Sequence, residues 1–420
     1  TNEGSVFLGY QAGKNTAGDY HYNVAIGMQS LSYAHTQSGT VAIGYKALEK
    51  VTSGSGNVAM GYEAMKNIVS GAGNVAIGYE AAEGFENGET GNVAIGFEAM
   101  ALADEGTGGG STDHNIAIGY QALTMGDVAS NDRNRQGNIA IGGFALNSTG
   151  DMSISGSIAI GYNALTAMNG GTGGNVAIGY QSSQGITTGA RNTAIGYQSL
   201  DSVDDGADNT VLGYQALASA AGNETANTAI GSYAMASINH DDSDANTAIG
   251  YEALKGSSIS INSNVAVGYQ AMSGSSNSDG SIAIGREAMK GSLTSATHGT
   301  VGIGREALAA LTSGAGNIAV GYQALLTETS GSGNTAVGYQ AGKLLTGASY
   351  NTIIGREAML AADGSESSNV AIGQSSMGGV NNNSTAQNVA IGRNSLVGGT
   401  GAITDTIAIG YFAGDGMGNI

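Results

Sequence analysis

The chain has no cysteine, no proline and no tryptophan among its 420 residues. The absence of cysteine excludes disulfides, thiol nucleophiles and thiolate metal sites. The absence of proline removes the residue that cannot donate a hydrogen bond to a β-ladder, which suits a chain whose backbone pairs nearly everywhere. No apolar run approaches the roughly 20 residues that a transmembrane helix needs.

Positive charge is also scarce. The chain has 14 lysines and arginines against 33 aspartates and glutamates, so its net charge is −19 at neutral pH. A nucleic-acid binder needs a basic stripe, which this composition does not provide. The charge also opposes adsorption to anionic lipid. We therefore expect no nucleic-acid partner and no membrane insertion in this segment.

Glycine and one repeated phrase are what the chain has in excess. There are 72 glycines, and a phrase of Asn, a β-branched residue, Ala, Ile, Gly, Tyr, Gln or Glu, Ala, and Leu or Met recurs twenty-three times. Residues 74–81 and 334–341 are clear copies. Most central glycines lie 17 to 19 residues apart, and two gaps are 23. A fixed period of this size indicates a stacked repeat architecture.

Each copy is numbered here from its central glycine, position 0. Positions −3 and −1 are Val, Ile, Thr, Leu or Met in every copy, and side chains two apart on a strand share a face. We interpret this face as the core of a coil, with a corner at the glycine. Positions +1 to +4 favour a second short strand or a tight turn, with a short helix as the alternative. Gly, Ser, Thr, Asn and Asp then close the coil.

The predicted fold is all-β, a parallel β-solenoid (β-roll) of about 23 short coils. The repeats run from Ser5 to Gly414, so we predict a single domain over residues 1–420 with longer loops at 100–115 and 123–138. Coils spaced by one strand separation, about 4.8 Å, would build a rod. The period disfavours helical-pair repeats, because 17 residues are too few for two packed helices and their turns.

Two further rows follow from the repeat. Position −4 is Asn in seventeen copies, and such side chains either bond along the stack or cap their own turn. Position +1 is Tyr in fourteen copies, and this row either packs at an interface or stacks sugars. Four arginines take the tyrosine position, and three of them precede a glutamate, which indicates ion pairs: Arg286, Arg305, Arg356 and Arg393, with Glu287, Glu306 and Glu357.

Position −2 is Ala in nineteen copies and lies opposite the two positions assigned to the core. A smooth row of small apolar side chains on the outside of a coil would let another backbone approach closely. We therefore predict an oligomer seam along this row, with copies associating about an axis parallel to the stack. The seam residues are Ala25, Ala42, Ala59, Ala76, Ala94, Ala177, Ala194, Ala319 and Ala336.

The Asn-Val-Ala-Ile-Gly phrase resembles the head repeats of trimeric autotransporter adhesins, and its extension Tyr-Gln-Ala-Leu is similar to repeats of bacteriophage tail fibres. The resemblance covers nearly the whole chain, although the period of 17 to 19 exceeds that of the adhesin heads. It implies a left-handed β-roll, a side-by-side homotrimer, and attachment to a host-surface receptor, a glycan being one kind. The implied location is extracellular, on a virion tail fibre or a cell surface. Both ends interrupt the repeat, so we expect a longer fibre protein.

No catalytic constellation is present in the sequence. The histidines at 21, 35, 114, 240 and 298 share no repeat position and no metal spacing. The aspartates at 201–208 and at 241–244 fit neither the EF-hand nor a calcium-binding solenoid pattern, and whether they bind calcium stays open. We expect no enzymatic activity, no cofactor and no metal.

The two longest gaps are the best candidates for a binding surface. They fall in adjacent coils, so their extra residues would emerge side by side, and insertions in repeat proteins often bind. A tolerated loop without a partner is the alternative. The possible surface-binding residues are Asp113, His114, Asp132, Arg133 and Arg135.

The functional hypothesis is a structural and attachment fibre segment, from a phage tail fibre or a surface adhesin. The alternative, from another class, is an ice- or mineral-binding solenoid, which needs a flat and regular face. Either the alanine row or the six threonines at position −3 would have to supply it. Against this alternative, the predicted fold turns those threonines inward and covers the alanines with partner chains.

Overall fold

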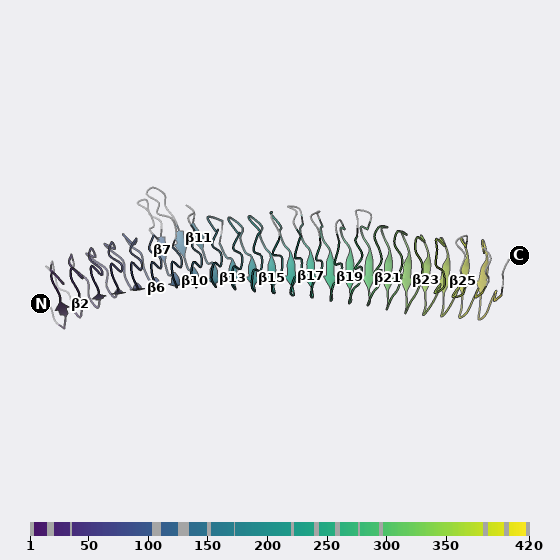
Figure 1. Cartoon of the computed structure of the whole chain (residues 1–420), viewed down its shortest axis with the longest axis horizontal. Helices are drawn as coiled ribbons and strands as arrows, with labels where there is room; N and C mark the ends of the chain where they lie inside the picture. The colour runs from purple at the N-terminus through teal and green to yellow at the C-terminus, as the bar shows by residue number, and fades with distance from the viewer. Residues whose placement is uncertain are drawn as a thin grey trace. The chain divides into compact units, whose positions relative to one another are not determined.

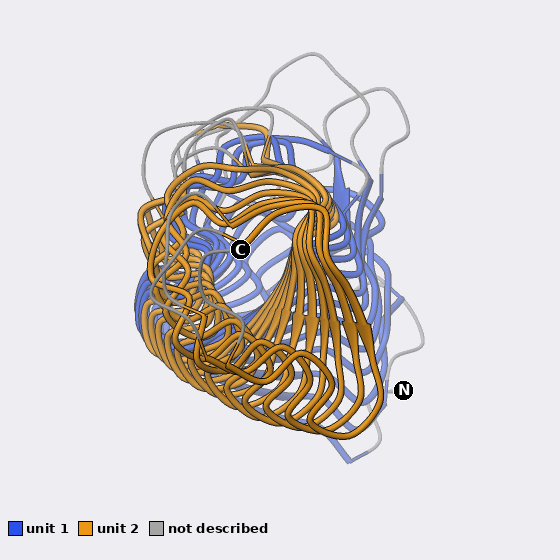
Figure 2. Cartoon of the chain, turned by 90° about the vertical axis from the view of Figure 1, so that its right-hand side faces the viewer, with its two compact units in different colours: residues 1–209 blue, residues 210–420 orange. Residues whose placement is uncertain are grey.

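A computed structural model describes residues 4–14, 21–33, 36–102, 111–124, 134–148, 153–171, 173–219, 222–238, 243–256, 261–275, 278–293, 297–380, 385–398 and 403–416. The chain divides into two compact units, residues 1–209 and 210–420, which Figure 2 distinguishes by colour. Within each unit, the chain winds through successive coils and contributes one short strand per coil to a common sheet (Figure 1).

The strands are short, and nearly all have three residues. In unit 1 the main sheet contains β1 (Val6–Leu8), β2 (Val24–Ile26), β3 (Val41–Ile43), β4 (Val58–Met60), β5 (Val75–Ile77), β6 (Val93–Ile95), β8 (Ile116–Ile118), β10 (Ile139–Ile141), β12 (Ile158–Ile160), β13 (Val176–Ile178) and β14 (Thr193–Ile195). A second, smaller sheet contains β7 (Ser111–Asp113), β9 (Asn134–Gln136) and β11 (Ile154–Ser155).

Unit 2 has the same architecture. Its sheet contains β15 (Thr210–Leu212), β16 (Thr228–Ile230), β17 (Thr247–Ile249), β18 (Val265–Val267), β19 (Ile282–Ile284), β20 (Val301–Ile303), β21 (Ile318–Val320), β22 (Thr335–Val337), β23 (Thr352–Ile354), β24 (Val370–Ile372), β25 (Val389–Ile391) and β26 (Ile407–Ile409). Figure 2 shows these arrows gathered on one wall of the coil, with loop backbone making up the rest of the outline.

Neighbouring strands pair parallel and in exact repeat register. Ala59 of β4 faces Ala76 of β5, for example, and Ala248 of β17 faces Ala266 of β18. The described residues contain no helix. The prediction of an all-β parallel β-solenoid, with its strand at positions −3 to −1, is therefore confirmed.

The inward and outward faces of the strand were predicted the wrong way round. The middle residue is buried in every main-sheet strand after β1, while the flanking residues at −3 and −1 are partly or fully exposed. The predicted seam alanines are all fully buried inside their own chain and offer no surface to a neighbour: Ala25, Ala42, Ala59, Ala76, Ala94, Ala177, Ala194, Ala319 and Ala336. The coil is narrow, so the small side chain fits its interior and the larger aliphatic ones point outward.

The bulk of the core comes from the segment after the glycine. The Leu or Met at +4 and the Ala at +3 are buried, as Met65 and Ala64 illustrate. The +4 side chain lies beneath position −2 of the next coil, because a Cβ added at Gly302 would lie 2.8 Å from Cγ of Met289. An alanine at −2 thus leaves room for a large residue at +4.

Positions +1 to +4 form a tight turn, which confirms one of the two favoured interpretations; the helical alternative is wrong for the described residues. Positions +2 and +4 lie in the left-handed region, with φ of 53° at Glu63 and 47° at Met65. This conformation costs an L-residue about 1–2 kcal/mol. Hydrogen bonds between coils offset the cost: Glu63 N–H donates to Tyr45 O at 2.8 Å, and Met65 N–H donates to Ala81 O at 3.0 Å.

The asparagines at −4 form a buried ladder. The backbone N–H and the side-chain Nδ2 of Asn74 both donate to Oδ1 of Asn57, at 2.9 and 3.2 Å. Asn74 Nδ2 also donates to the carbonyl oxygen of Glu89 at 2.7 Å. Each amide thus bonds to the coil on either side, which confirms the interpretation of bonding along the stack.

Candidate functional site

An exposed apolar surface runs along the sheet in each unit, and we call it the outer face. It consists of the side chains at −3 and −1 of the main-sheet strands, together with the row at +1. Ten aliphatic residues of this face, all at −1 or −3, are 36% to 46% exposed: Met60, Ile77, Ile118 and Ile195 in unit 1, and Leu212, Ile249, Ile284, Ile318, Val337 and Ile354 in unit 2. Contiguous exposed apolar surface of this kind marks an interaction site.

Aromatic rings at +1 stack along the edge of this face. Tyr62 and Tyr79 have ring centroids 5.0 Å apart and planes within 6° of parallel, and Tyr180 and Tyr197 are nearly the same at 5.1 Å and 9°. Because each ring covers the face of the next, the ladder presents ring edges and hydroxyl groups to its surroundings. This geometry disfavours the flat stacking of sugars between rings and supports packing as the role of the row.

The arginines that replace tyrosine continue the ladder in unit 2. Arg305 lies 2.9 Å from Oε1 of Glu306 and Arg356 lies 3.1 Å from Oε1 of Glu357, so the predicted ion pairs form within the chain. Arg286 and Glu287 make a longer pair at 3.7 Å. Their guanidinium groups also lie over neighbouring tyrosine rings, as Arg356 does over Tyr339 at 5.8 Å. The side chains of these arginines are at least half exposed, so each pair contributes about 0–1 kcal/mol.

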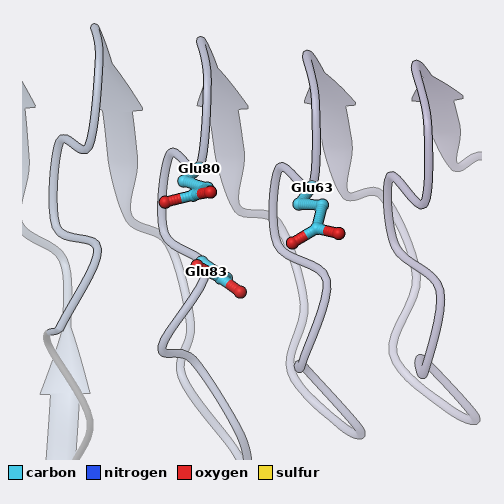
Figure 3. A group of neighbouring side chains, drawn as sticks. All are labelled: Glu63, Glu80 and Glu83. Atoms are coloured by element: carbon cyan, nitrogen blue, oxygen red, sulfur yellow. The ribbon is translucent and has the colours of Figure 1, made fainter.

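Three carboxylates gather beside the ladder in unit 1. Glu80 and Glu83 belong to one coil and Glu63 to the coil beside it (Figure 3), and their oxygens lie within 4.8 Å of one another. Lys66 Nζ lies 2.8 Å from Glu63 and 3.4 Å from Glu83. Burial raises the pKa of Glu83. The hydrogen bond from Lys66 to Glu63 raises the pKa of Lys66. The lysine already supplies the positive charge that a cation would bring, so we interpret the cluster as an ion-pair network.

Sequence reasoning did not find this cluster. Its members come from positions +2 and +5 of two consecutive copies. Glu63 belongs to one copy and meets Glu80 and Glu83 of the next copy only when the two coils stack. Among the described residues it is the one group of three His, Asp or Glu side chains whose ligand atoms come so close together. The only available signal was the recurrence of Glu at +2 in consecutive copies.

The described members of the predicted loop set, Asp113, His114 and Arg135, do not form one surface. Asp113 ends β7, where its carboxylate accepts the N–H of Thr90 at 2.7 Å and the hydroxyl of Ser111. His114 follows it and is exposed. The prediction that Arg135 lies at the surface is wrong. Arg135 is the middle residue of β9, its side chain is 1% exposed, and it points into the coil.

The reason for this burial is the same alternation that buries Ala at −2. The side chains opposite Arg135 in the pairing, Thr112 of β7 and Ile154 of β11, are buried as well. Asp132 and Arg133 lie outside the described residues, as do His35, His240, Asp241 and Asp242.

Two aspartates of the acidic segment at 201–208 bond to side chains of an adjacent coil. Asp205 accepts hydrogen bonds from the hydroxyls of Thr188 and Thr187, which lower the pKa of its carboxyl group. Asp208 pairs with Arg191 at 2.7 Å, and this hydrogen bond lowers its pKa. These carboxylates therefore stabilise loop contacts between coils.

No family model matches the chain, and no curated protein is significantly similar to it. In the described part of the chain, no helix has the length and apolar character needed to span a membrane. The solenoid and its outer face are therefore the features of this chain that indicate a function.

Proposed function

We propose that this chain is a structural and attachment segment of an extracellular fibre, a phage tail fibre or a surface adhesin, and that it works as a side-by-side homotrimer. The single observation that carries the proposal is the outer face, an apolar surface repeated coil after coil in both units. The side chain of Ile249, for example, is 39% exposed in the single chain. Covering it with a neighbouring chain removes apolar surface from water, which favours association.

A second copy of the same chain is the occupant that fits best. Its outer face carries the same rows at the same spacing, so contacts made in one coil recur in the next. The rows at −3 and −1 contain no charged residue that would have to be desolvated. We therefore assign the oligomer seam to the exposed aliphatic rows at −3 and −1 instead of the buried alanines. The number of chains, three, is taken from the family resemblance.

Molar mass in solution tests the self-association. Light scattering after size-exclusion chromatography should give a multiple of the 41.5 kDa chain mass. The double variant Ile77→Lys, Ile249→Lys places charge on the outer face and should shift the protein to monomer with its circular dichroism unchanged. The matched control is Asn87→Lys, Ala315→Lys, which adds the same charge at exposed loop positions and should keep the oligomer. A wild-type monomer at micromolar concentration would overturn the proposal.

Attachment itself requires a receptor, and the two 23-residue repeats, whose extra residues precede β7 and β9 in the sequence, depart most from the common repeat length. A glycan array and adsorption to intact bacterial cells measure it directly. We expect binding that weakens on His114→Ala, since that side chain is exposed beside β7, and that survives the control Asn223→Ala on an exposed loop of unit 2. Binding by neither assay would leave only the structural role.

One observation favours a second candidate, ice or mineral binding. Thr210, Thr228 and Thr247 occupy position −3 of consecutive coils and point outward, opposite to the direction expected from the sequence. They form a row at one strand separation, about 4.8 Å, on a sheet surface. Thermal hysteresis measured on the purified protein, and its loss in Thr228→Lys, would favour this function over self-association.

A further inference from the structure

The aromatic ladder contains runs of tyrosine interrupted by other side chains. In unit 1, Tyr45, Tyr62 and Tyr79 stack at 5.1 and 5.0 Å between centroids, and Phe97 follows at 5.0 Å. Tyr62 and Tyr79 are 43% and 42% exposed. Three phenol rings thus stack in succession, with interplanar angles of 26° and 6°, and none of the three is buried.

Carboxylates accompany these phenols. A hydrogen bond with Glu80 raises the pKa of Tyr79 to about 12. Burial, followed by the charge of Glu63, raises the pKa of Tyr62. Both phenols are therefore protonated at neutral pH, and each has an adjacent base that can accept the phenolic proton when the ring loses an electron.

We propose that the stacked tyrosines are a site of oxidative cross-linking, in which a one-electron oxidant joins rings of neighbouring coils as dityrosine. Each of two phenols gives one electron to an equivalent of oxidant and its hydroxyl proton to Glu63, Glu80 or water. The two phenoxyl radicals then form a carbon–carbon bond between their ortho positions. The two ortho hydrogens move to the phenol oxygens, so the net change is the loss of two electrons and two protons.

The ladder favours this coupling over reaction between separate molecules. A ring centroid 5.0 Å from its neighbour meets its partner without diffusion, and only a tilt of the two rings brings the ortho carbons together. The chain has no cysteine, so a Tyr62–Tyr79 bond would be a covalent link between coils that disulfides cannot supply. Phe97 interrupts the run, because it has no phenol to oxidise.

The test uses the full chain at low micromolar concentration with tris(bipyridyl)ruthenium(III), generated by light with persulfate as the terminal acceptor. Proteolysis and mass spectrometry then identify dityrosine peptides. We expect the Tyr45–Tyr62 and Tyr62–Tyr79 links within single chains, which keep the monomer mass on a denaturing gel. Tyr350, 69% exposed and not stacked on another ring in the described structure, serves as the internal comparison.

Two variants make the result decisive. Tyr62→Phe keeps a stacked ring, as Phe97 does, and should abolish both links, whereas Tyr350→Phe should leave them unchanged. The proposal is overturned if cross-links concentrate on Tyr350, or if Tyr45 and Tyr79 still appear in dityrosine peptides of the Tyr62→Phe variant. The expected links lie within one chain and keep the monomer mass on a denaturing gel, whereas links between copies that meet at the +1 row would appear at multiples of that mass, so the two proposals fail separately.

Discussion

The central glycine is constrained twice at the scale of a single residue. Gly78 has φ of +140°, in a region that L-residues rarely adopt, and a Cβ there would lie 2.2 Å from the carbonyl oxygen of Gly96 in the next coil. The same close approach recurs from Gly96 to Gly119. The stacked glycines thus allow the corners of successive coils to touch backbone to backbone.

Replacing this glycine should be costly. Gly78→Ala should destabilise the protein by about 3 kcal/mol, since the methyl group meets backbone that cannot move away without opening the stack. The matched control is Gly73→Ala in the same coil, where φ is +69° and a Cβ would have open space. It should cost only about 1 kcal/mol. Urea titration followed by circular dichroism measures both, and equal losses would contradict the argument.

The buried asparagine ladder gives a second prediction at this scale. Asn92 Oδ1 accepts the backbone N–H of Asn115 at 2.9 Å, and Asn92 Nδ2 donates to the carbonyl of Thr112 at 2.7 Å. Asn92→Ala leaves both buried groups without these partners, which should cost about 2–4 kcal/mol in unfolding free energy.

The comparison variant for the ladder is Asn92→Ser. Serine occurs naturally in this row at Ser281, where Oγ accepts the N–H of Thr300 at 3.3 Å and donates to the carbonyl of Thr297 at 3.0 Å. We therefore expect Asn92→Ser to lose about half as much as Asn92→Ala in the same denaturation experiment. A serine variant as unstable as the alanine variant would show that the amide's bonds to neighbouring amides dominate.

At the scale of the strand and its turn, the core is a balance between positions −2 and +4. The two largest −2 residues each have a glycine at a nearby +4 position: Gly13 lies beside Phe7, and Gly342 lies beside Ile353. A Cβ at Gly342 would come within 2.9 Å of Cδ1 of Ile353. The two positions therefore share one volume, which either of them can fill.

Exchanging the large and the small residue between positions −2 and +4 tests whether the two side chains share one volume. Ile353→Ala alone should cost about 2–4 kcal/mol because it leaves a cavity, and Gly342→Leu alone about 1–3 kcal/mol because it overpacks. The double variant recreates the usual pair of Leu at +4 and Ala at −2. Leucine is compatible with the backbone there, since Gly342 has φ of 59° and Leu325 has 49° at the equivalent position.

The readout is a double-mutant cycle from urea denaturation. We expect the double variant to be more stable than the sum of the single losses predicts, by about 1–3 kcal/mol. Simple additivity would mean that the two side chains do not compete for space and would contradict the packing inferred here.

At the scale of the whole molecule, charge and apolar surface act in opposition. Each copy carries a net charge of −19, so copies repel one another at low salt, whereas the outer face gains free energy on being covered. Raising sodium chloride from about 0.02 M to about 0.5 M shortens the Debye length several-fold. Self-association should therefore tighten with salt in sedimentation equilibrium. Weakening with salt would instead indicate an interface built on ion pairs.

The sequence by itself determined the period, the strand at −3 to −1, the glycine corner and the asparagine row, because each follows from local chemistry repeated at fixed spacing. Which side of the strand faces inward was decided only by the tertiary structure. Alternation divides a strand into two faces but does not say which one lies in the coil, and the interior volume left by a leucine or methionine at +4 favours a small side chain at −2. The same geometry turned Arg135 inward and brought Glu63 beside Glu80 and Glu83. Contacts between successive coils depend on how the chain closes each turn, which no single repeat encodes.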